Sequence, residues 1–350
     1  MKYRASLLLI VLLLTVSIAD AQDSAAAKAL NRSGVERMQR GDIDGAIAEF
    51  DRAIAIDPRL ATAYMNRGSA KRRKKDLDGA LADFDRAIEL EPGFAPAYSN
   101  RALARREKGD FDGAMADFDK AINLEPRDSS FYLGRAGLKQ SRNDMDGAMA
   151  DLDKAIQIDP RNPYAYINRG NLKRKRGDID GAVADMDRAV EIDPKLALMA
   201  RGAVLDAKGS RVMAAEDYDK AIALNPSKAT GALINRGNQK RKDGDIDGAI
   251  EDYTKAIEND PKNIFAYLNR GSAFREKRDL DRAVADYSTA IKLNPDFAHA
   301  YFARGLALLQ MGKDDEAQKD FEKCLKLDPG MKASLEEQIK RVREQRAANQ

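Results

Sequence analysis

The residues with the most obvious chemical potential are aspartates in a recurring D-x-D-G motif. The motif recurs along the chain, for example at residues 42–45, 110–113, 178–181 and 245–248. Closely spaced carboxylates suit Ca²⁺, but an EF-hand loop needs a glutamate at its twelfth position, where loops starting at Asp42 and Asp178 have Ala53 and Ala189. The calcium interpretation therefore fails. We expect the first aspartate to cap a helix N-terminus and the second to oppose the positive end of the helix dipole.

Side chains that commonly carry catalysis are scarce. The 350 residues include one histidine, His299, and one cysteine, Cys324. This excludes disulfide frameworks, Cys/His zinc sites and mechanisms that need more than one histidine. The formal net charge is only +3, from 60 Lys+Arg and 57 Asp+Glu, and the interleaved aspartates would repel phosphate. We therefore expect no enzyme activity, no cofactor, no metal and no nucleic-acid partner.

The elements that carry these motifs repeat along the chain. Prolines recur at intervals of 34 residues, with one interval of 32 and one of 35: Pro58, Pro92, Pro126, Pro160, Pro194, Pro226, Pro261, Pro295 and Pro329. Such a period indicates stacked supersecondary units. With each proline as position 32, nine repeats are predicted over 27–329: 27–60, 61–94, 95–128, 129–162, 163–194, 195–229, 230–263, 264–297 and 298–329.

Each repeat is predicted to be two antiparallel helices, because apolar residues fall at helical spacing in two blocks separated by a break. Position 8 is Gly or Ala and position 20 is Ala in most repeats, which lets the two helices approach closely. Position 24 carries the bulk of the predicted core: Phe50, Phe84, Phe118, Leu152, Met186, Tyr218, Tyr253, Tyr287 and Phe321.

A small residue at position 8, Ala at 20, an aromatic residue at 24, Ala at 27 and Pro at 32 on this period resemble the tetratricopeptide repeat family. The resemblance implies an all-α, right-handed α-solenoid in which the first helix of each repeat lines a concave groove. It also implies a protein-binding scaffold without catalytic activity. The family's Trp at position 4 is replaced here by tyrosine, as at Tyr64. Residues 330–350 are predicted to form a capping helix and tail, with Met331, Leu335, Ile339 and Val342 on one face.

Position 7 is arginine and position 23 is aspartate in the same eight repeats, as in Arg101 and Asp117. The first repeat instead has Ser33 and Glu49 at these positions. In an antiparallel hairpin the two positions lie close together. We therefore predict a ladder of Arg–Asp pairs with a structural role.

A candidate binding surface is the stripe of the first helix that faces the groove in the resembling family. Its arginines at position 12 suit carboxylates, because guanidinium binds them bidentately. Together with apolar residues and the recurring asparagines, the predicted groove residues are Arg72, Arg106, Arg174, Arg241, Arg275, Met65, Ile167, Ile234, Leu268, Asn168, Asn235 and Asn269. Two interpretations stay open: a groove for a protein or peptide with acidic residues, or a solvated charged face.

The repeat at 195–229 is irregular. It carries Asp206 where neighbouring repeats have arginine, and Ser210-Arg211 where they have an aspartate followed by an apolar residue. We expect this repeat to bend or interrupt the groove.

The N-terminus resembles a secretory signal peptide. Lys2 and Arg4 precede an apolar run from residue 7 to residue 18, and small residues follow up to Ala21. The run is shorter than the roughly 20 residues that span a bilayer, so cleavage after Ala21 is favoured over an uncleaved anchor, with 22–26 as a short linker.

We therefore expect an exported scaffold, in the periplasm first or secreted otherwise. The alternative is a structural assembly factor of an envelope complex that uses its convex or end surfaces. The sequence does not determine the oligomeric state.

Overall fold

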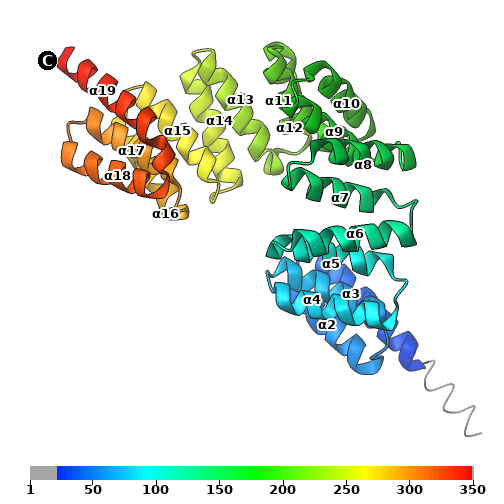
Figure 1. The fold of residues 1–350 in the computed structure, drawn as a ribbon. Helices are drawn as coiled ribbons and strands as arrows, with labels where there is room; N and C mark the ends of the chain where they lie inside the picture. Colours follow the sequence, from blue (N-terminus) through cyan, green and yellow to red (C-terminus); the bar gives the residue numbers. More distant parts are fainter. Residues whose placement is uncertain (1–21, 349–350) are drawn as a thin grey trace, which may run out of the picture. The chain divides into compact units, whose positions relative to one another are not determined.

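The computed structural model describes residues 22–348, so the expected signal peptide (1–21) and residues 349–350 lie outside them. Over this range the chain is made of helices and turns, without a strand (Figure 1). The prediction of an all-α solenoid is thereby confirmed. None of the helices within 22–348 combines the length and apolar character needed to cross a membrane.

The helices alternate along the chain as the first and second members of hairpins. The first members are a helix over residues 22–39, α3 (Ala61–Arg73), α5 (Ala95–Lys108), α7 (Ser129–Ser141), α9 (Pro163–Lys175), α11 (Pro194–Lys208), α13 (Thr230–Lys242), α15 (Ile264–Glu276) and α17 (Ala298–Gln310). The second members are α2 (Ile43–Ile56), α4 (Leu77–Leu90), α6 (Phe111–Leu124), α8 (Met145–Ile158), α10 (Ile179–Ile192), α12 (Arg211–Leu224), α14 (Ile246–Asn259), α16 (Leu280–Leu293) and α18 (Asp314–Leu327). Short 3₁₀ segments η1 (Pro226–Lys228) and η2 (Pro329–Met331) precede α13 and the final helix α19 (Lys332–Ala348).

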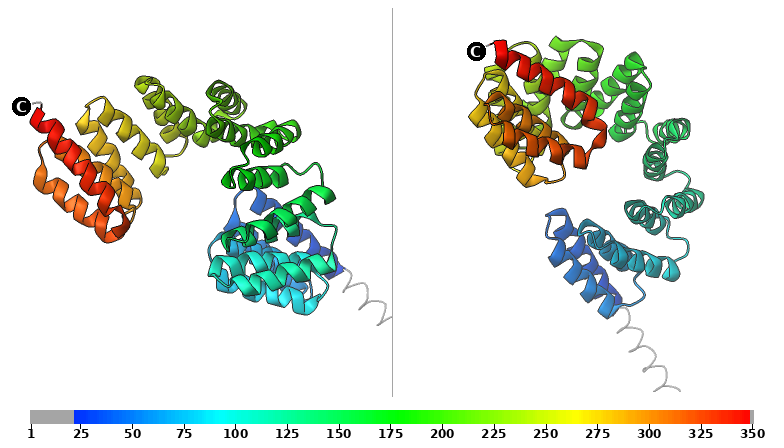
Figure 2. Two further views of the ribbon diagram at one scale, coloured as in Figure 1. Left: turned by 45° about the horizontal axis from the view of Figure 1, so that its top comes forward. Right: turned by 60° about the vertical axis from the view of Figure 1, so that its left-hand side comes forward.

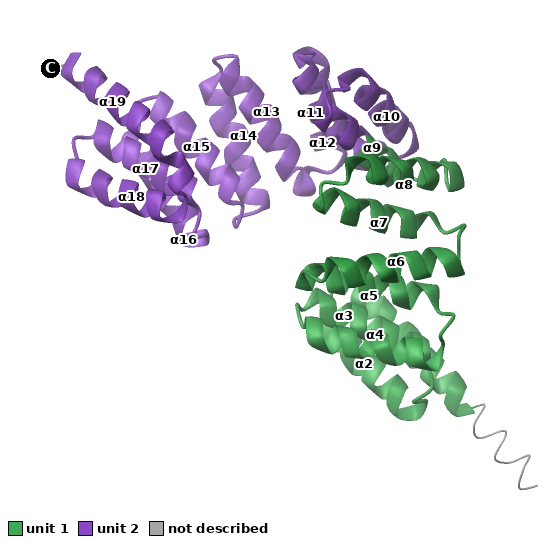
Figure 3. Ribbon diagram, viewed as in Figure 1, with its two compact units in different colours: residues 1–169 green, residues 170–350 purple. Residues whose placement is uncertain are grey.

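The chain divides into two compact units, and the boundary in the sequence, between Arg169 and Gly170, falls within α9 (Figure 3). We call residues 22–169 the N-terminal unit and residues 170–348 the C-terminal unit. Within each unit, consecutive helices pack side by side and each hairpin stacks on the next.

The core of each hairpin is a large side chain of the second helix packed against a small residue of the first. Phe84 and Ala80 are fully buried on α4, and a Cβ added to Gly68 of α3 would lie 2.8 Å from the Phe84 ring. No larger residue fits at this position without moving the ring. The predicted roles of positions 8, 20 and 24 are confirmed.

The aspartates of the D-x-D-G motif cap helices as predicted. Asp110, for example, accepts a hydrogen bond from the backbone N–H of Gly113 at 2.9 Å, and Asp42 does the same for Gly45. In the irregular repeat, Ser210 precedes α12 but makes no such side-chain bond. Seven other second helices begin with an aspartate whose side chain caps the helix, and this cap is missing at α12.

Two local expectations are wrong. Residues 22–26, expected as a linker, are helical and continuous with the helix over 22–39, because Ala25 and Ala26 favour the helix. Pro194, expected only to end the preceding helix, is also the first residue of α11. A proline is well suited to this position, since its missing N–H would have no partner in the first turn anyway.

The final helix covers the end of the stack. α19 packs against α17 (Figure 2), and Leu335 and Val342 are buried on its inner face, with Ile339 packed beside them. A polar outer face completes the cap, as a terminal repeat requires.

Candidate protein-interaction groove

An arginine–aspartate ladder holds the hairpins together. Arg101 donates Nε and Nη2 to the two carboxylate oxygens of the buried Asp117 at 2.9 and 2.6 Å, and donates Nη1 to Asp85 of the preceding repeat at 2.6 Å. The same bidentate pair recurs in Arg67–Asp83, Arg135–Asp151, Arg201–Asp217, Arg236–Asp252, Arg270–Asp286 and Arg304–Asp320. The predicted structural ladder is confirmed, and it also links successive repeats.

A second cation reinforces many of these aspartates. Arg105 lies 2.8 Å from Asp117, and Lys71 lies 2.8 Å from Asp83. The hydrogen bonds to Asp83 and Asp51 raise the pKa of Arg67 above its ordinary value. Positions 7 and 11 of the first helix therefore serve packing rather than a ligand in these repeats.

Cations at position 14 are engaged in structural pairs as well. They contact the second aspartate of the preceding repeat's motif in Lys74–Asp44, Lys108–Asp78, Arg142–Asp112, Lys208–Asp180 and Lys277–Asp247. Much of the basic end of the first helix is thus paired. The position-12 arginines have to be considered one by one.

In the N-terminal unit, the predicted groove residues have varied surroundings. Arg72 pairs with Glu107 at 2.6 Å, while Arg106 is half-buried and its Nη1 lies 3.3 Å from a Cβ added to Gly137. Met65 packs against the core around Phe84. On α9, Ile167 is half-buried and Asn168 is exposed.

In the C-terminal unit, three predicted residues line one polar cavity of about 300 Å³, which we call the groove pocket. These residues are Asn235, Arg241 and Asn269; Ala203, Asp206, Tyr218, Asn238 and Lys242 complete the lining. They come from the first helices α11, α13 and α15, and from Tyr218 on α12. The structure therefore brings two position-6 asparagines and one position-12 arginine together.

Tyrosine hydroxyls hydrogen-bond two of the three asparagines of the groove pocket. The Tyr253 hydroxyl donates to Oδ1 of Asn238 at 2.7 Å, and burial raises the pKa of Tyr253 to about 12. Burial also raises the pKa of Tyr218, and a hydrogen bond with Asn235 opposes this shift. Both tyrosines therefore stay neutral at physiological pH, and their hydroxyls hold the amides of Asn235 and Asn238 in position.

The charges around the groove pocket are loosely paired. Arg241 lies 3.6 Å from Glu276, and Lys242 lies 3.6 Å from Asp206. Both separations exceed the 2.7–2.9 Å of a tight charge-assisted hydrogen bond. The two cations can therefore turn toward an incoming carboxylate without breaking a short pair.

The other predicted residues of the C-terminal unit lie outside the groove pocket. Ile234 packs against the core that contains Tyr218, and Leu268 packs against the core around Tyr287. Arg174 is exposed on α9, and Arg275 lines a different cavity. The row of arginines is therefore not one continuous contact surface.

Sequence reasoning missed Tyr218 and Asn238, and treated Asp206 only as an irregularity. The usable signal was the change at position 24 from Phe or an aliphatic residue to Tyr in three successive repeats. A buried tyrosine hydroxyl needs a partner, so this change indicates polar residues above it. Among residues 22–348, no cluster of His, Cys, Asp and Glu has the arrangement of a metal site.

Comparisons with known proteins agree with this architecture. Tetratricopeptide and TPR repeat models match residues 34–74, 61–94, 95–128, 140–175, 163–196, 237–277, 271–312 and 298–331. A search of curated proteins found no significant match.

Two solved structures align with parts of the chain. The crystal structure of the APC/C hetero-tetramer Cut9–Hcn1 is similar with a TM-score of 0.59 at 17% identity, over 85% of this chain and 59% of that chain. This chain thus spans less than two thirds of its neighbour's length. MamA aligns with a TM-score of 0.41 at 27% identity, over 47% of this chain and 96% of MamA. The repeat matches and the helical solenoid indicate a protein-interaction scaffold, and the chain belongs to the tetratricopeptide repeat family.

Proposed function

We propose that this chain is an exported scaffold whose groove pocket binds an extended segment of another polypeptide that carries acidic residues. The observation that carries the proposal is the convergence of Asn235, Asn238 and Asn269 with Arg241 in one cavity. Three of these four residues, Asn235, Asn269 and Arg241, were predicted from the sequence, and all four place polar groups around one cavity.

The chemistry of the groove pocket suits a peptide backbone. Each asparagine amide offers both a donor and an acceptor, which matches the N–H and C=O groups of an extended chain. A cavity of about 300 Å³ accommodates a short stretch of backbone with one side chain, whereas a helix is about 10 Å wide. Arg241 and Lys242 would then bind a carboxylate of that segment.

The buried tyrosines Tyr218 and Tyr253 support the proposal, because they limit the entropic cost of binding. The Asn238 amide is already held by the Tyr253 hydroxyl at 2.7 Å before a ligand arrives. Preorganised groups lose less conformational freedom on association. Affinity then depends on the new hydrogen bonds and on charge complementarity.

The test is direct titration of the purified chain, residues 22–350, with a short fluorescein-labelled peptide of alternating Glu and Gly. We expect the double variant Asn235→Ala/Asn269→Ala to weaken binding by at least about fivefold, since each lost hydrogen bond contributes about 0.5–1.5 kcal/mol. The matched control is Asn66→Ala/Asn168→Ala, which removes two position-6 asparagines of the N-terminal unit and should change affinity less than twofold. Equal losses in both variants, or a Lys/Gly peptide that binds as well, would overturn the proposal.

Export rests on the leader-like residues 1–21. We expect the full-length chain to be found in the exported fraction with Gln22 as its first residue. Fractionation and N-terminal sequencing check this, and a chain that keeps Met1 in the cytosol would contradict it.

A further inference from the structure

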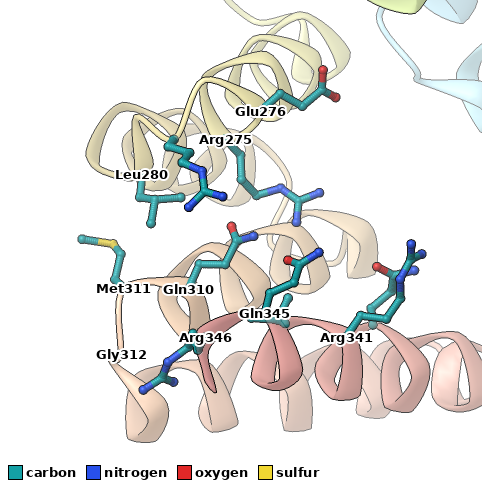
Figure 4. A pocket seen from close by; sticks show the side chains of 12 residues that line it. Arg275, Glu276, Leu280, Gln310, Met311, Gly312, Arg341, Gln345 and Arg346 are labelled. Carbon is teal, nitrogen blue, oxygen red and sulfur yellow. The ribbon is translucent and has the colours of Figure 1, made fainter. Parts of the chain in front are cut away.

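A second and larger cavity lies at the end of the C-terminal unit, where the final helix closes the stack (Figure 4). It measures about 820 Å³ and is bounded by α15, the end of α17 and α19. We call it the cap cavity. Its volume falls within the usual range for ligand sites in proteins.

The lining of the cap cavity is cationic and rich in amides. Arg275, Arg278 and Arg341 contribute positive charge, and Gln310, Gln338 and Gln345 contribute amides. A fourth arginine, Arg346, is neutralised by Asp314 at 2.9 Å. The cavity's single carboxylate, on Glu276, faces Arg241 at 3.6 Å. The remaining charge therefore favours an anion.

Two residues that line the cap cavity each carry a buried polar atom without a hydrogen-bond partner. These atoms are Nε of Arg275, which can only donate, and Oε1 of Gln310, which can only accept. Both side chains, together with Gln345, point into the same space (Figure 4). A buried polar group without a partner is unfavourable, so a ligand that reaches and pairs both atoms is favoured over one that pairs only one of them.

The pairing requirement distinguishes between anions. A fully ionised inorganic anion or a free carboxylate offers acceptors to Arg275 but no donor to Gln310. An Asp or Glu residue within a polypeptide offers a carboxylate and, a few ångströms away, a backbone N–H. An acidic residue of a peptide therefore satisfies both orphan atoms.

The cap cavity also adjoins the groove pocket. Glu276 lines the cap cavity, and its ion-pair partner Arg241 lines the groove pocket. An extended segment lying across Arg241 would thus reach the cap cavity within a few residues.

We propose that the cap cavity is an anchoring site for an acidic residue of the polypeptide bound in the groove pocket. Arg275 and Arg341 bind the carboxylate, and Gln310 accepts a backbone N–H. This inference rests on the proposed function and adds a second, separately removable contact.

The test uses the chain over residues 22–350 with selectively ¹³C-labelled methionine methyl groups. Met311 lines the cap cavity, and its resonance, assigned with a Met311→Leu variant, reports this site alone. We expect the Glu/Gly peptide to shift the Met311 methyl signal and to bind Arg341→Glu at least about tenfold more weakly. The matched control is Lys340→Glu, the same charge change at the next residue, whose exposed side chain lies outside the cavity lining and 3.9 Å from Glu344. It should bind within twofold of the parent.

The outcomes separate the two proposals. A peptide that binds the parent and Arg341→Glu equally, without shifting Met311, overturns the cap cavity and leaves the groove pocket standing. Unchanged binding by Asn235→Ala/Asn269→Ala, with Met311 still shifted, overturns the groove pocket instead. Phosphate or glutarate that shifts Met311 at the same concentration as the peptide overturns the assignment to a polypeptide.

Discussion

The two units are built from the same helix hairpins but differ in the large side chains that their second helices bury beneath the groove. Three second helices of the N-terminal unit bury Phe50, Phe84 and Phe118, whereas three of the C-terminal unit bury Tyr218, Tyr253 and Tyr287. The remaining repeats bury Leu152, Met186 and Phe321 at this position. The tyrosine rings pack against glycine as the phenylalanine rings do, and the added hydroxyls reach groove side chains. In these three repeats one hydroxyl oxygen therefore places a polar atom beneath the groove, while the packing of the helices stays the same.

The ladder differs between the units in a second way. Asp117 and Asp83 are each paired with two cations, from positions 7 and 11. Position 11 is apolar in three repeats of the C-terminal unit, where Leu205, Phe274 and Leu308 are buried instead. The N-terminal unit therefore depends more on charge, and the C-terminal unit more on apolar packing.

The largest expected change in stability comes from removing an aspartate of the Arg–Asp ladder, and it tests the difference between the two units. Asp117→Ala leaves both Arg101 and Arg105 without their buried carboxylate and should lower the free energy of unfolding by about 3–5 kcal/mol. Asp286→Ala removes the partner of Arg270 only, next to the apolar Phe274, and should cost clearly less. Urea unfolding followed by circular dichroism checks both variants. Equal losses would show that the second cation contributes nothing.

An intermediate change in stability is expected from exchanging Phe and Tyr at position 24. Phe118→Tyr buries a hydroxyl beside Leu103 and should cost about 1–3 kcal/mol, because the hydroxyl finds no partner there. Tyr253→Phe removes the bond to Asn238 and should cost about 0.5–1.5 kcal/mol at neutral pH.

The pH dependence of stability gives a second test of the role of Tyr253. The pKa of Tyr253 is about 12 in the folded chain against an ordinary value near 10, so its neutral form is favoured by folding. The contribution of Tyr253 is fully present below about pH 10 and is lost as the pH rises toward 12, since the unfolded chain ionises first. The stability difference between the parent and Tyr253→Phe should therefore shrink over this range. A constant difference would contradict the assignment.

The smallest effect concerns the helix start without an aspartate cap. Ser210→Asp should stabilise the C-terminal unit by up to about 1 kcal/mol, by supplying the bond that Ser210 does not make. Asp110→Ala in the N-terminal unit should destabilise by a similar amount, since it removes the bond to Gly113. Thermal melts of both variants check these opposite signs, and Ser210→Ala, expected to be neutral, is the control.

Sequence periodicity predicted the hairpins, the aspartate caps and the Arg–Asp ladder, because each depends on contacts at fixed spacing within a repeat or between neighbours. The candidate site was predicted less well. Asn235, Asn269 and Arg241 do line one cavity, but Arg72 is engaged with Glu107 and Arg275 faces the cap cavity. Which arginine is free depends on partners one repeat away, and those partners vary along the chain. The cap cavity requires α19 to be placed against α15 and α17, which no repeat pattern specifies.

Asp193 couples the end of α10 to the start of α11 in the C-terminal unit. This residue ends α10 by donating its N–H to Ala189 and starts α11 by accepting from the N–H of Leu196. Between other consecutive α-helices of the described chain at least two residues intervene, as the four between Leu90 and Ala95 do. Because one residue terminates both helices, fraying of either end removes a hydrogen bond from the other. Amide protons flanking Asp193 should consequently exchange with deuterium as one cooperative group, while the longer connections let their helix ends open independently.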